Sequence, residues 1–227
     1  MRRIVVIPAG GSGTRCDEAL PKQYHKVKDK EILAYSIEVF QKCDLIDEIV
    51  VSAQSEYFDL ISKIADKYGF DKLKKIVEGG KQRQDSVFNA IQAVSAENDD
   101  LVAVHDAARP LLSQDILLKA FETAENFGSA LVCIHARDTL VVGQNNNIES
   151  YLDRAKVFYA QTPQIFRFSI LKESMDLAFK EGFYGTDESM LVKRAGYEIK
   201  LVEGSIMNFK ITTKPDLEIF EKLCGVL

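Results

Sequence analysis

The sequence predicts an α/β fold whose sheet is doubly wound and mostly parallel. Short runs rich in β-branched residues recur along the first 134 residues, and segments with apolar residues at helical spacing lie between them. When strands and helices alternate in this way, right-handed crossovers place helices on both faces of a parallel sheet. The runs are apolar at nearly every position, which is typical of strands that are buried on both faces.

The expected strands and helices follow one another along the chain. Strands are expected at residues 4–7, 49–51, 76–77, 101–104 and 130–134. Helices are expected between them, at residues 33–40, 57–68, 87–94 and 117–124. Helical spacing returns at 171–178, and strand-like sequence follows at 197–202. A last helix is expected after Thr213, where Asp216 completes a pattern similar to a capping box.

The alternation of strands and helices stops between residues 137 and 159. This polar stretch contains the turn signal GQNNN at residues 143–147, between two short strand-like runs. We therefore expect residues 137–159 to form a protruding hairpin arm. A chain of 227 residues fits one domain, so the arm is expected to project from a single domain over residues 1–227.

The composition excludes several classes of protein. With 46% hydrophobic and 28% charged residues, the chain has the average composition of a globular protein, unlike disordered or collagen-like sequences. Its 29 basic and 34 acidic residues give a net charge of −5, which argues against a general nucleic-acid or membrane-surface binder. Because no apolar run suggests a signal peptide or a membrane span, we expect a cytoplasmic protein. Reduced thiols are expected at the widely spaced Cys16, Cys43, Cys133 and Cys224.

A glycine-rich loop follows the first expected strand, where doubly wound sheets bind their ligands. The motif PAGGSGTR at residues 8–15 offers consecutive N–H groups to phosphate oxygens, and Arg15 and Lys22 would add positive charge for a polyphosphate. The alternative is a plain tight turn flanked by two solvated surface cations. The loop is not a Walker A motif, and Cys16 stands where a dinucleotide-binding fingerprint has its third glycine.

A carboxylate stands at the end of the fourth expected strand, in the motif VHDAARP at residues 104–110. Asp106 is well placed there to hold Mg²⁺, or another divalent cation, against phosphate oxygens. The alternative is a loop aspartate that caps nearby N–H groups. The three histidines show no ligand spacing and are expected to be structural: His25, His105 and His135.

Polar motifs also occur in the second half of the chain. They are Asp153-Arg154, QTPQ at residues 161–164, TDES at residues 186–189, and NFKITT at residues 208–213. Thr186 would serve equally well as an ordinary helix N-cap. Lys210 would add a third cation near a helix start, although a lone lysine more often faces solvent.

Nine motifs in a fixed order carry a resemblance to a known family. They are PAGGSGTR, LPKQY, EGGKQRQDSV, VHDAARP, ARDTL, DRAKVFYAQTPQIF, TDES, LVEGSIMNFKITT and PDL. Over essentially its whole length, the chain resembles the 2-C-methyl-D-erythritol 4-phosphate cytidylyltransferases of isoprenoid precursor synthesis. Two positions depart from the family: Cys16 stands where Met is frequent, and Lys81 where an acidic residue is common. Both substitutions are expected to be tolerated, although Lys81 could disturb contacts to the base or ribose.

The resemblance implies a Rossmann-like sheet of the nucleotide-diphosphosugar transferase type and an enzyme that transfers CMP from CTP to the polyol phosphate, releasing pyrophosphate. The cations implied in catalysis are Arg15, Lys22 and Lys210. The implied metal ligand, for Mg²⁺, is Asp106. The implied nucleotide contacts are Ala9, Gly10, Gly11, Gly80 and Ser86. The residues implied to position the second substrate are Arg109, Thr139, Arg154, Thr162 and Thr186.

The resemblance also implies a homodimer in which arm residues reach the neighbouring site. The closest alternative is a ribitol 5-phosphate cytidylyltransferase, but the Ala107-Ala108 pair and the surroundings of Arg154 resemble the methylerythritol enzymes more. A non-catalytic nucleotide sensor need not keep Lys22, Asp106 and Lys210 together. The attacking phosphate oxygen is already ionised at neutral pH, so the reaction needs no catalytic His, Ser or Cys.

Overall fold

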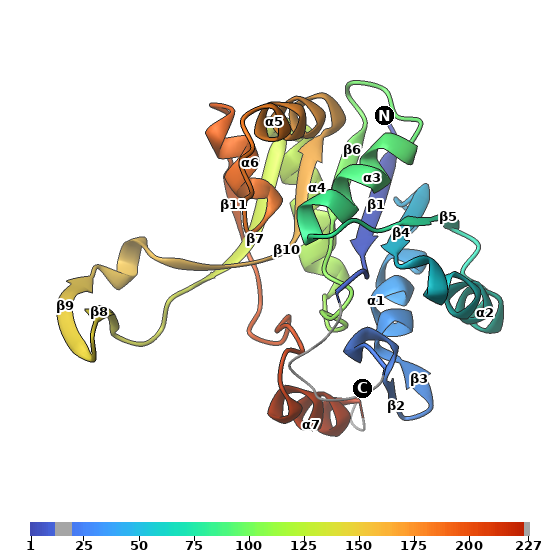
Figure 1. Cartoon of the computed structure of the whole chain (residues 1–227), viewed down its shortest axis with the longest axis horizontal. Coiled ribbons are helices and arrows are strands. Elements are labelled where there is room, and N and C mark those ends of the chain that lie inside the picture. The colour runs from blue at the N-terminus through green and yellow to red at the C-terminus, as the bar shows by residue number, and fades with distance from the viewer. Residues whose placement is uncertain (12–19, 225–227) are drawn as a thin grey trace.

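The computed structural model describes residues 1–11 and 20–224 and is built around one seven-stranded sheet (Figure 1). The strand order is β11-β7-β10-β6-β1-β4-β5. These strands are β1 (Arg3–Pro8), β4 (Glu48–Ala53), β5 (Leu73–Glu78), β6 (Leu101–Val104), β7 (Ser129–His135), β10 (Phe158–Arg167) and β11 (Lys200–Glu203). The sheet is parallel except at β10, which runs antiparallel to both β6 and β7.

Helices cover both faces of this sheet, as the doubly wound pattern predicts (Figure 1). They are α1 (Ile32–Gln41), α2 (Phe58–Tyr68), α3 (Arg83–Ala93), α4 (Gln114–Phe127), α5 (Phe168–Lys180) and α6 (Glu188–Arg194). Helix α7 (Lys214–Leu223) lies beyond the end of the sheet (Figure 1), where Phe220 packs in a separate cluster with Ile32 and Ile211. Along β1, Val5 and Ile7 pack into one buried cluster with α1, α2 and α4, while Ile4 and Val6 pack into a second cluster with α3, α5 and α6. Alternate residues of one strand therefore enter opposite cores, which requires apolar residues at every position.

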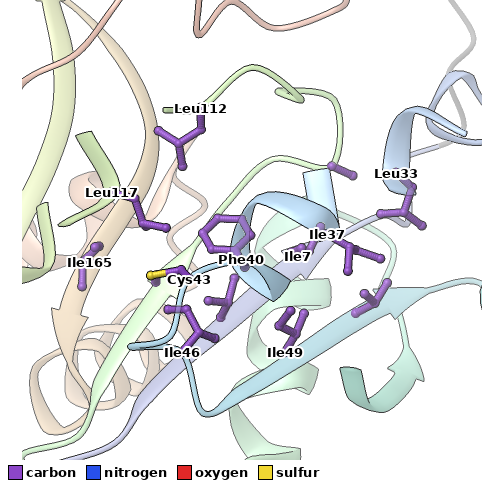
Figure 2. Close-up of a cluster of buried hydrophobic side chains, with 14 of the residues drawn as sticks. Ile7, Leu33, Ile37, Phe40, Cys43, Ile46, Ile49, Leu112, Leu117 and Ile165 are labelled. Atoms are coloured by element: carbon purple, nitrogen blue, oxygen red, sulfur yellow. The ribbon is translucent and has the colours of Figure 1, made fainter. Parts of the chain in front are cut away.

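The first core is centred on α1. Figure 2 shows Phe40 and Ile37 of this helix above Ile7 of β1 and Ile49 of β4, all without exposed surface. The apolar residues predicted to line this helix on one side are the ones that meet the sheet. Within the described part of the chain, no helix is both long and apolar enough to cross a membrane.

The hairpin arm is a separate two-stranded sheet formed by β8 (Leu140–Gln144) and β9 (Asn147–Leu152). Asn145 and Asn146 at its turn have positive φ values of 51° and 64°, as a two-residue hairpin turn requires. Figure 1 shows the hairpin away from the sheet, at the end of two extended chain segments. It interrupts the antiparallel pair formed by β7 and β10, whose pairing begins where Phe158 lies opposite His135. A projecting hairpin is therefore present within residues 137–159, although Phe158 and Tyr159 at the end of this range already pair with β7 as part of β10.

Among the elements of the body that were not predicted are β10 and α6. In β10 the strand pattern is hidden because Gln161, Thr162, Pro163 and Gln164 stand in its middle. The three polar side chains are buried, and Pro163 falls where the pairing with β7 shifts in register, a position that tolerates the missing N–H. The strand expected at 197–202 is instead β11, displaced towards its C-terminal end. A short hairpin of β2 (Lys26–Val27) and β3 (Lys30–Glu31) precedes α1.

Candidate functional site

A cavity of about 590 Å³ opens beyond the carboxyl ends of β1, β4 and β6. The chain runs from β1 to β4 and β5 on one side and then returns to β6 on the other side of β1, so the strand order reverses here. Such a reversal is the usual ligand site of doubly wound sheets. The cavity is lined by Pro8, Ala9, Gly10, Gly11, Lys22, Gln23, Gln54, Gly80, Lys81, Gln82, Arg83, Ser86, Asp106, Ala107, Ala108, Lys210 and Thr212. It therefore collects eight of the site residues predicted from the sequence.

The described part of the glycine-rich loop is held by two glutamine side chains. The amide of Gln23 donates to the carbonyls of Ala9 and Gly11 at 2.6 and 3.0 Å. The amide of Gln54 donates to the carbonyl of Gly10. Gln23 belongs to the one-turn helix η2 (Lys22–Tyr24), so the same short element presents Lys22 and shapes the loop. Of the loop's predicted cations, Arg15 lies outside the described residues.

The turn between β5 and α3 lies next to this loop and forms another part of the cavity wall. The hydroxyl of Ser86 accepts a hydrogen bond from Gly80 N at 3.0 Å and donates to Gln82 O at 3.1 Å. A side chain at Gly80 would collide with Asp85, so only glycine allows the turn to close this tightly. Gln82 and Asp85 form a capping box that begins α3. The backbone around Gly80 is thereby fixed at the cavity edge.

Asp106 is the centre of a buried charge cluster. Its Oδ1 accepts a bond from Arg83 Nε at 3.2 Å, and its Oδ2 lies 3.3 Å from Arg109 Nε and 3.0 Å from Lys210 Nζ. Burial disfavours the charged carboxylate, but the positive charges of Arg83, Lys210 and Arg109 outweigh it and hold the pKa of Asp106 well below its ordinary value. The cluster therefore favours the anionic form of the side chain, whose partners are cationic side chains rather than the N–H groups that a capping aspartate would bind.

The residues around Asp106 suit a metal ion that arrives with a nucleotide. Among the described residues, no group of three or more His, Cys, Asp or Glu side chains could hold a metal. Mg²⁺ in nucleotide sites needs only one or two carboxylates, because phosphate oxygens and water supply the other ligands. Asp106 meets this requirement from the cavity wall, although both of its oxygens contact cations here. Magnesium therefore stays a prediction.

His105 and Thr162 support Asp106 from behind. The hydroxyl of Thr162 accepts from Asp106 N and bonds His105 Nδ1, both at 3.1 Å. His105 Nε2 lies 3.0 Å from the carbonyl of Arg109, which can only accept, so this nitrogen carries the proton. Burial lowers the pKa of His105 from 6.5 to about 4 and keeps the ring neutral. The predicted structural role of His105 agrees with these contacts, and Thr162 lies in the interior rather than in the cavity lining.

Several predicted substrate contacts lie outside the cavity lining. Arg109 donates to Asn208 O at 2.7 Å besides contacting Asp106. Arg154 lies on the arm and donates to Arg137 O, and Thr139 directly precedes β8. The structure does not bring these arm residues to the cavity of their own chain, and their roles stay predictions.

The structure contradicts the alternative interpretations of Thr186 as a helix N-cap and of Lys210 as a solvent-facing lysine. Thr186 does not cap a helix: its hydroxyl lies 3.1 Å from Met190 Sδ, and Asp187 caps α6 by accepting from Met190 N. Thr186 remains a predicted substrate contact. Lys210 is not a lone solvent-facing lysine, because its ammonium pairs with Asp106.

Sequence reasoning did not single out Arg83, Glu188, Gln54 or Asn208. Arg83 and Glu188 lie inside motifs that carry the resemblance, EGGKQRQDSV and TDES, but nothing in the sequence shows that they meet. Glu188 is only 1% exposed, and Asn208 is completely buried with its amide on Thr162 O. For Arg83 and Glu188, the sequence offered one signal of function: each is a charged residue inside a motif, with no partner nearby in sequence.

Comparison with known proteins gives a consistent result. The family model described as 2-C-methyl-D-erythritol 4-phosphate cytidylyltransferase matches residues 3–224. Curated proteins of that name from Clostridium acetobutylicum and Lysinibacillus sphaericus are 40% and 39% identical over 221 and 217 residues. Each alignment covers 96% of this chain, and 95% and 93% of the two relatives.

Solved structures with the same fold carry the same description. A crystal structure of the Francisella tularensis 2-C-methyl-D-erythritol 4-phosphate cytidylyltransferase superimposes with a TM-score of 0.84 at 31% identity, covering 98% of this chain and 99% of that one. The corresponding Thermus thermophilus structure gives 0.82 at 29% identity, with 99% and 100% coverage.

Proposed function

Because the chain belongs to the 2-C-methyl-D-erythritol 4-phosphate cytidylyltransferase family, we propose that it transfers CMP from CTP to 2-C-methyl-D-erythritol 4-phosphate and releases pyrophosphate. One observation of this chain supports the proposal above all. The described start of the glycine loop, from Pro8 to Gly11, lines one cavity together with Lys22, Asp106 and Lys210, at the reversal of strand order. A ligand with several phosphates and a base fits a cavity that combines backbone N–H groups with fixed charges.

The chemistry requires positioning and charge compensation. A phosphate oxygen of the polyol attacks the α-phosphorus of CTP, a new P–O bond forms, and the bond to the leaving pyrophosphate breaks. The nucleophile is already ionised, so no general base is needed. Lys22 and Lys210 lie where they would offset the charge on the α-phosphate and the leaving group. Arg15 would contribute further positive charge.

Asp106 would hold the divalent cation. When bound, Mg²⁺ would supply positive charge that offsets the negative charge of the phosphates and of the leaving pyrophosphate. Lys210 is paired with Asp106 in this structure. A triphosphate in the cavity would offer Lys210 a second anion, while Arg83 and Arg109 stay on the carboxylate.

The second substrate and the arm complete the proposal. Arg109, Thr139, Arg154, Thr162 and Thr186 would position the polyol phosphate, with the arm residues serving a neighbouring subunit. The arm exposes a set of large apolar side chains, namely Val141, Val142, Ile148, Tyr151 and Leu152. An apolar surface on a projecting hairpin is better suited to contact with a second copy than to water. Buried free thiols at Cys43 and Cys133 are in keeping with the reducing cytoplasm, where we place the enzyme.

Pyrophosphate release from CTP tests the function directly. Methylerythritol phosphate and ribitol 5-phosphate are supplied in parallel, each with Mg²⁺ and each with EDTA. We expect turnover with methylerythritol phosphate and Mg²⁺, its loss in EDTA and its return when Mg²⁺ is restored. Faster turnover with ribitol 5-phosphate would favour the alternative polyol. Binding of CTP without pyrophosphate release would favour a nucleotide sensor, and full turnover in EDTA would remove the metal role of Asp106.

The Asp106→Asn variant removes the negative charge of the side chain but keeps its size and shape. We expect activity to fall by orders of magnitude, because an amide is a poor Mg²⁺ ligand. The variant also leaves three cations without their shared anion, so some loss of stability accompanies it. Circular dichroism of the purified variant gives the folded fraction by which its activity is corrected.

A further inference from the structure

Arg83 joins two buried carboxylates that come from different parts of the chain. Its Nη1 donates to both oxygens of Glu188 at 2.7 and 2.9 Å, while its Nε donates to Asp106 Oδ1 at 3.2 Å. Arg83 is the first residue of α3, Glu188 is the first residue of α6, and Asp106 follows β6. The planar, forked guanidinium can satisfy both carboxylates at once, which an ammonium group cannot do with the same geometry.

The segment between α5 and α6 is attached to the same place. The side chain of Gln84, next to Arg83, accepts from Gly185 N at 2.9 Å and donates to Phe183 O at 3.1 Å. From β10, the amide of Gln164 donates to Asp187 at 2.9 Å and its carbonyl oxygen accepts from Ser189 N at 2.9 Å. Side chains of α3 and β10 thus hold the segment that contains Thr186.

The partners of Asp106 differ in how firmly they are held. The side chain of Lys210 is 40% exposed and lines the cavity, so an incoming phosphate can compete for it. Arg83 is tied to Glu188, whose side chain is 1% exposed and is not part of the cavity lining. When Lys210 turns to a phosphate, Arg83 would still hold Asp106 Oδ1.

We propose that Arg83 and Glu188 are positioning residues for the transfer reaction. Glu188 fixes the position of the Arg83 guanidinium, and Arg83 fixes the Asp106 carboxylate at the cavity wall. The same bridge fixes the segment that contains Thr186 relative to Asp106. This inference rests on the proposed function, because it assigns the bridge to the two substrates of that reaction.

Glu188→Gln tests the bridge without changing the cavity lining. The amide keeps the size of the side chain and removes the charge that anchors Arg83. We expect kcat to fall at least about tenfold, as is typical when an outer partner of a metal-binding group is removed. The KM for the polyol phosphate should rise because the Thr186 segment is loosened. The KM for CTP should stay within about twofold, because Glu188 does not line the cavity within the part of the chain that the structure describes.

Arg83→Lys and the double variant test whether the two residues act as one unit. Arg83→Lys should give the same kinetic pattern, because lysine cannot contact both carboxylates. The double variant Arg83→Gln with Glu188→Gln replaces the ion pair by a neutral pair and avoids an uncompensated buried charge. Its kcat should be no lower than that of the worse of Arg83→Gln and Glu188→Gln made singly, because both changes break the same bridge.

Glu181→Gln is the matched control. It makes the same chemical change in the same segment, at an exposed ion pair with Arg194 of α6 that does not touch Asp106. Its kinetic constants should equal those of the wild type. Wild-type kinetics in folded Glu188→Gln, or defects that multiply in the double variant, would overturn the proposal, as would an equal loss in Glu181→Gln.

Hydrogen exchange followed by mass spectrometry gives a readout that needs no substrate. Glu188→Gln should speed amide exchange in residues 183–189 and in the peptide that contains Asp106, with the remaining sheet unchanged. Uniformly faster exchange would mean a merely structural role, and unchanged exchange would mean that the bridge holds nothing in place. If the wild type turned over neither polyol phosphate, the proposed function would fail, and the exchange data alone would decide whether the bridge positions these two segments.

Discussion

His105 has a charge state that the fold imposes on it. The ring is completely buried and bonded to Thr162 and to the Arg109 carbonyl. Burial lowers its pKa to about 4 in the folded protein, against an ordinary value of 6.5. Between these two values the unfolded chain binds a proton that the folded protein does not bind. The free energy of unfolding therefore falls as the pH decreases from 6.5 towards 4, and this contribution is fully present only above pH 6.5.

His105→Asn removes the titrating ring and should flatten this pH dependence. Between pH 5 and 6, the wild-type free energy of unfolding should fall more steeply than that of the variant, by up to about 1.4 kcal/mol per pH unit. Urea unfolding at several pH values measures both slopes. The variant will be less stable at pH 7 because it loses buried contacts, so the comparison concerns slopes only. Parallel slopes would show that His105 titrates normally in the folded protein.

Lys22 and Lys210 line the same cavity but are expected to act at different stages of the reaction. If Lys22 stabilises charge that develops during transfer, Lys22→Ala should lower kcat while the KM for CTP changes little. If Lys210 instead mainly holds the ground-state phosphate of the second substrate, Lys210→Ala should chiefly raise the KM for the polyol phosphate. Steady-state kinetics with each substrate varied in turn separates the two patterns. An unchanged kcat with weaker CTP binding in Lys22→Ala would reverse its assignment.

At the scale of secondary-structure elements, the N-terminus of α7 forms the capping box that its sequence predicts. The Thr213 side chain accepts from Asp216 N, and the Asp216 carboxylate accepts from the backbone of Thr213 and Thr212 at 2.8 and 2.9 Å. The capping box predicted from four consecutive residues is therefore confirmed. Such a pattern can be read from sequence because all its partners lie within one helical turn.

Thr213→Ala should destabilise the protein by about 1 kcal/mol through loss of this cap. Thr123→Ala is the control, since Thr123 lies inside α4 and its hydroxyl bonds only the carbonyl of Lys119 one turn earlier. That change should cost less than about 0.5 kcal/mol, because alanine is the better helix former. Chemical denaturation of both variants supplies the difference. Equal effects would show that the box contributes nothing beyond helix propensity.

For the whole molecule, the position of the arm determines how a complete site could be assembled. Lys22 lies in the cavity of the body, whereas Arg154 lies in η4 (Arg154–Lys156) at the base of a hairpin that projects away from that body (Figure 1). The two residues therefore belong to parts of one chain that are separated in space. A site that needs both is more readily completed between two subunits than within one.

Mixing Lys22→Ala and Arg154→Ala proteins tests this arrangement. Each variant alone should be nearly inactive. After dissociation and random reassociation, half of the dimers are mixed, and each mixed dimer contains one site with both native residues. About a quarter of the wild-type sites should then reappear in a symmetric dimer. If exchange is confirmed with a labelled subunit and no activity returns, Arg154 serves its own chain's site.

Much of this architecture follows from sequence alone, because it depends on local periodicity. The strands at residues 4–7 and 101–104 were predicted from apolar runs, and the glycine loop and Asp106 from their places directly after those strands. Strand β10 was not predicted because the polar residues in its middle are typical of a loop. Gln161 and Gln164 can be buried there only because Ser205 and the α6 region supply hydrogen-bond partners distant in sequence.

The sequence by itself determined the fold class, the family and the residues that meet the cavity after β1 and β6, since hydrophobic period and contiguous motifs are properties of the chain. The tertiary structure alone decided which charges face one another. Arg83 and Glu188 are 105 positions apart, and Arg83 and Asp106 are 23 apart, yet all three share one buried bridge. Burial is what selects these partners, because a buried charge is tolerated only beside an opposite charge, and only the folded sheet brings the two together.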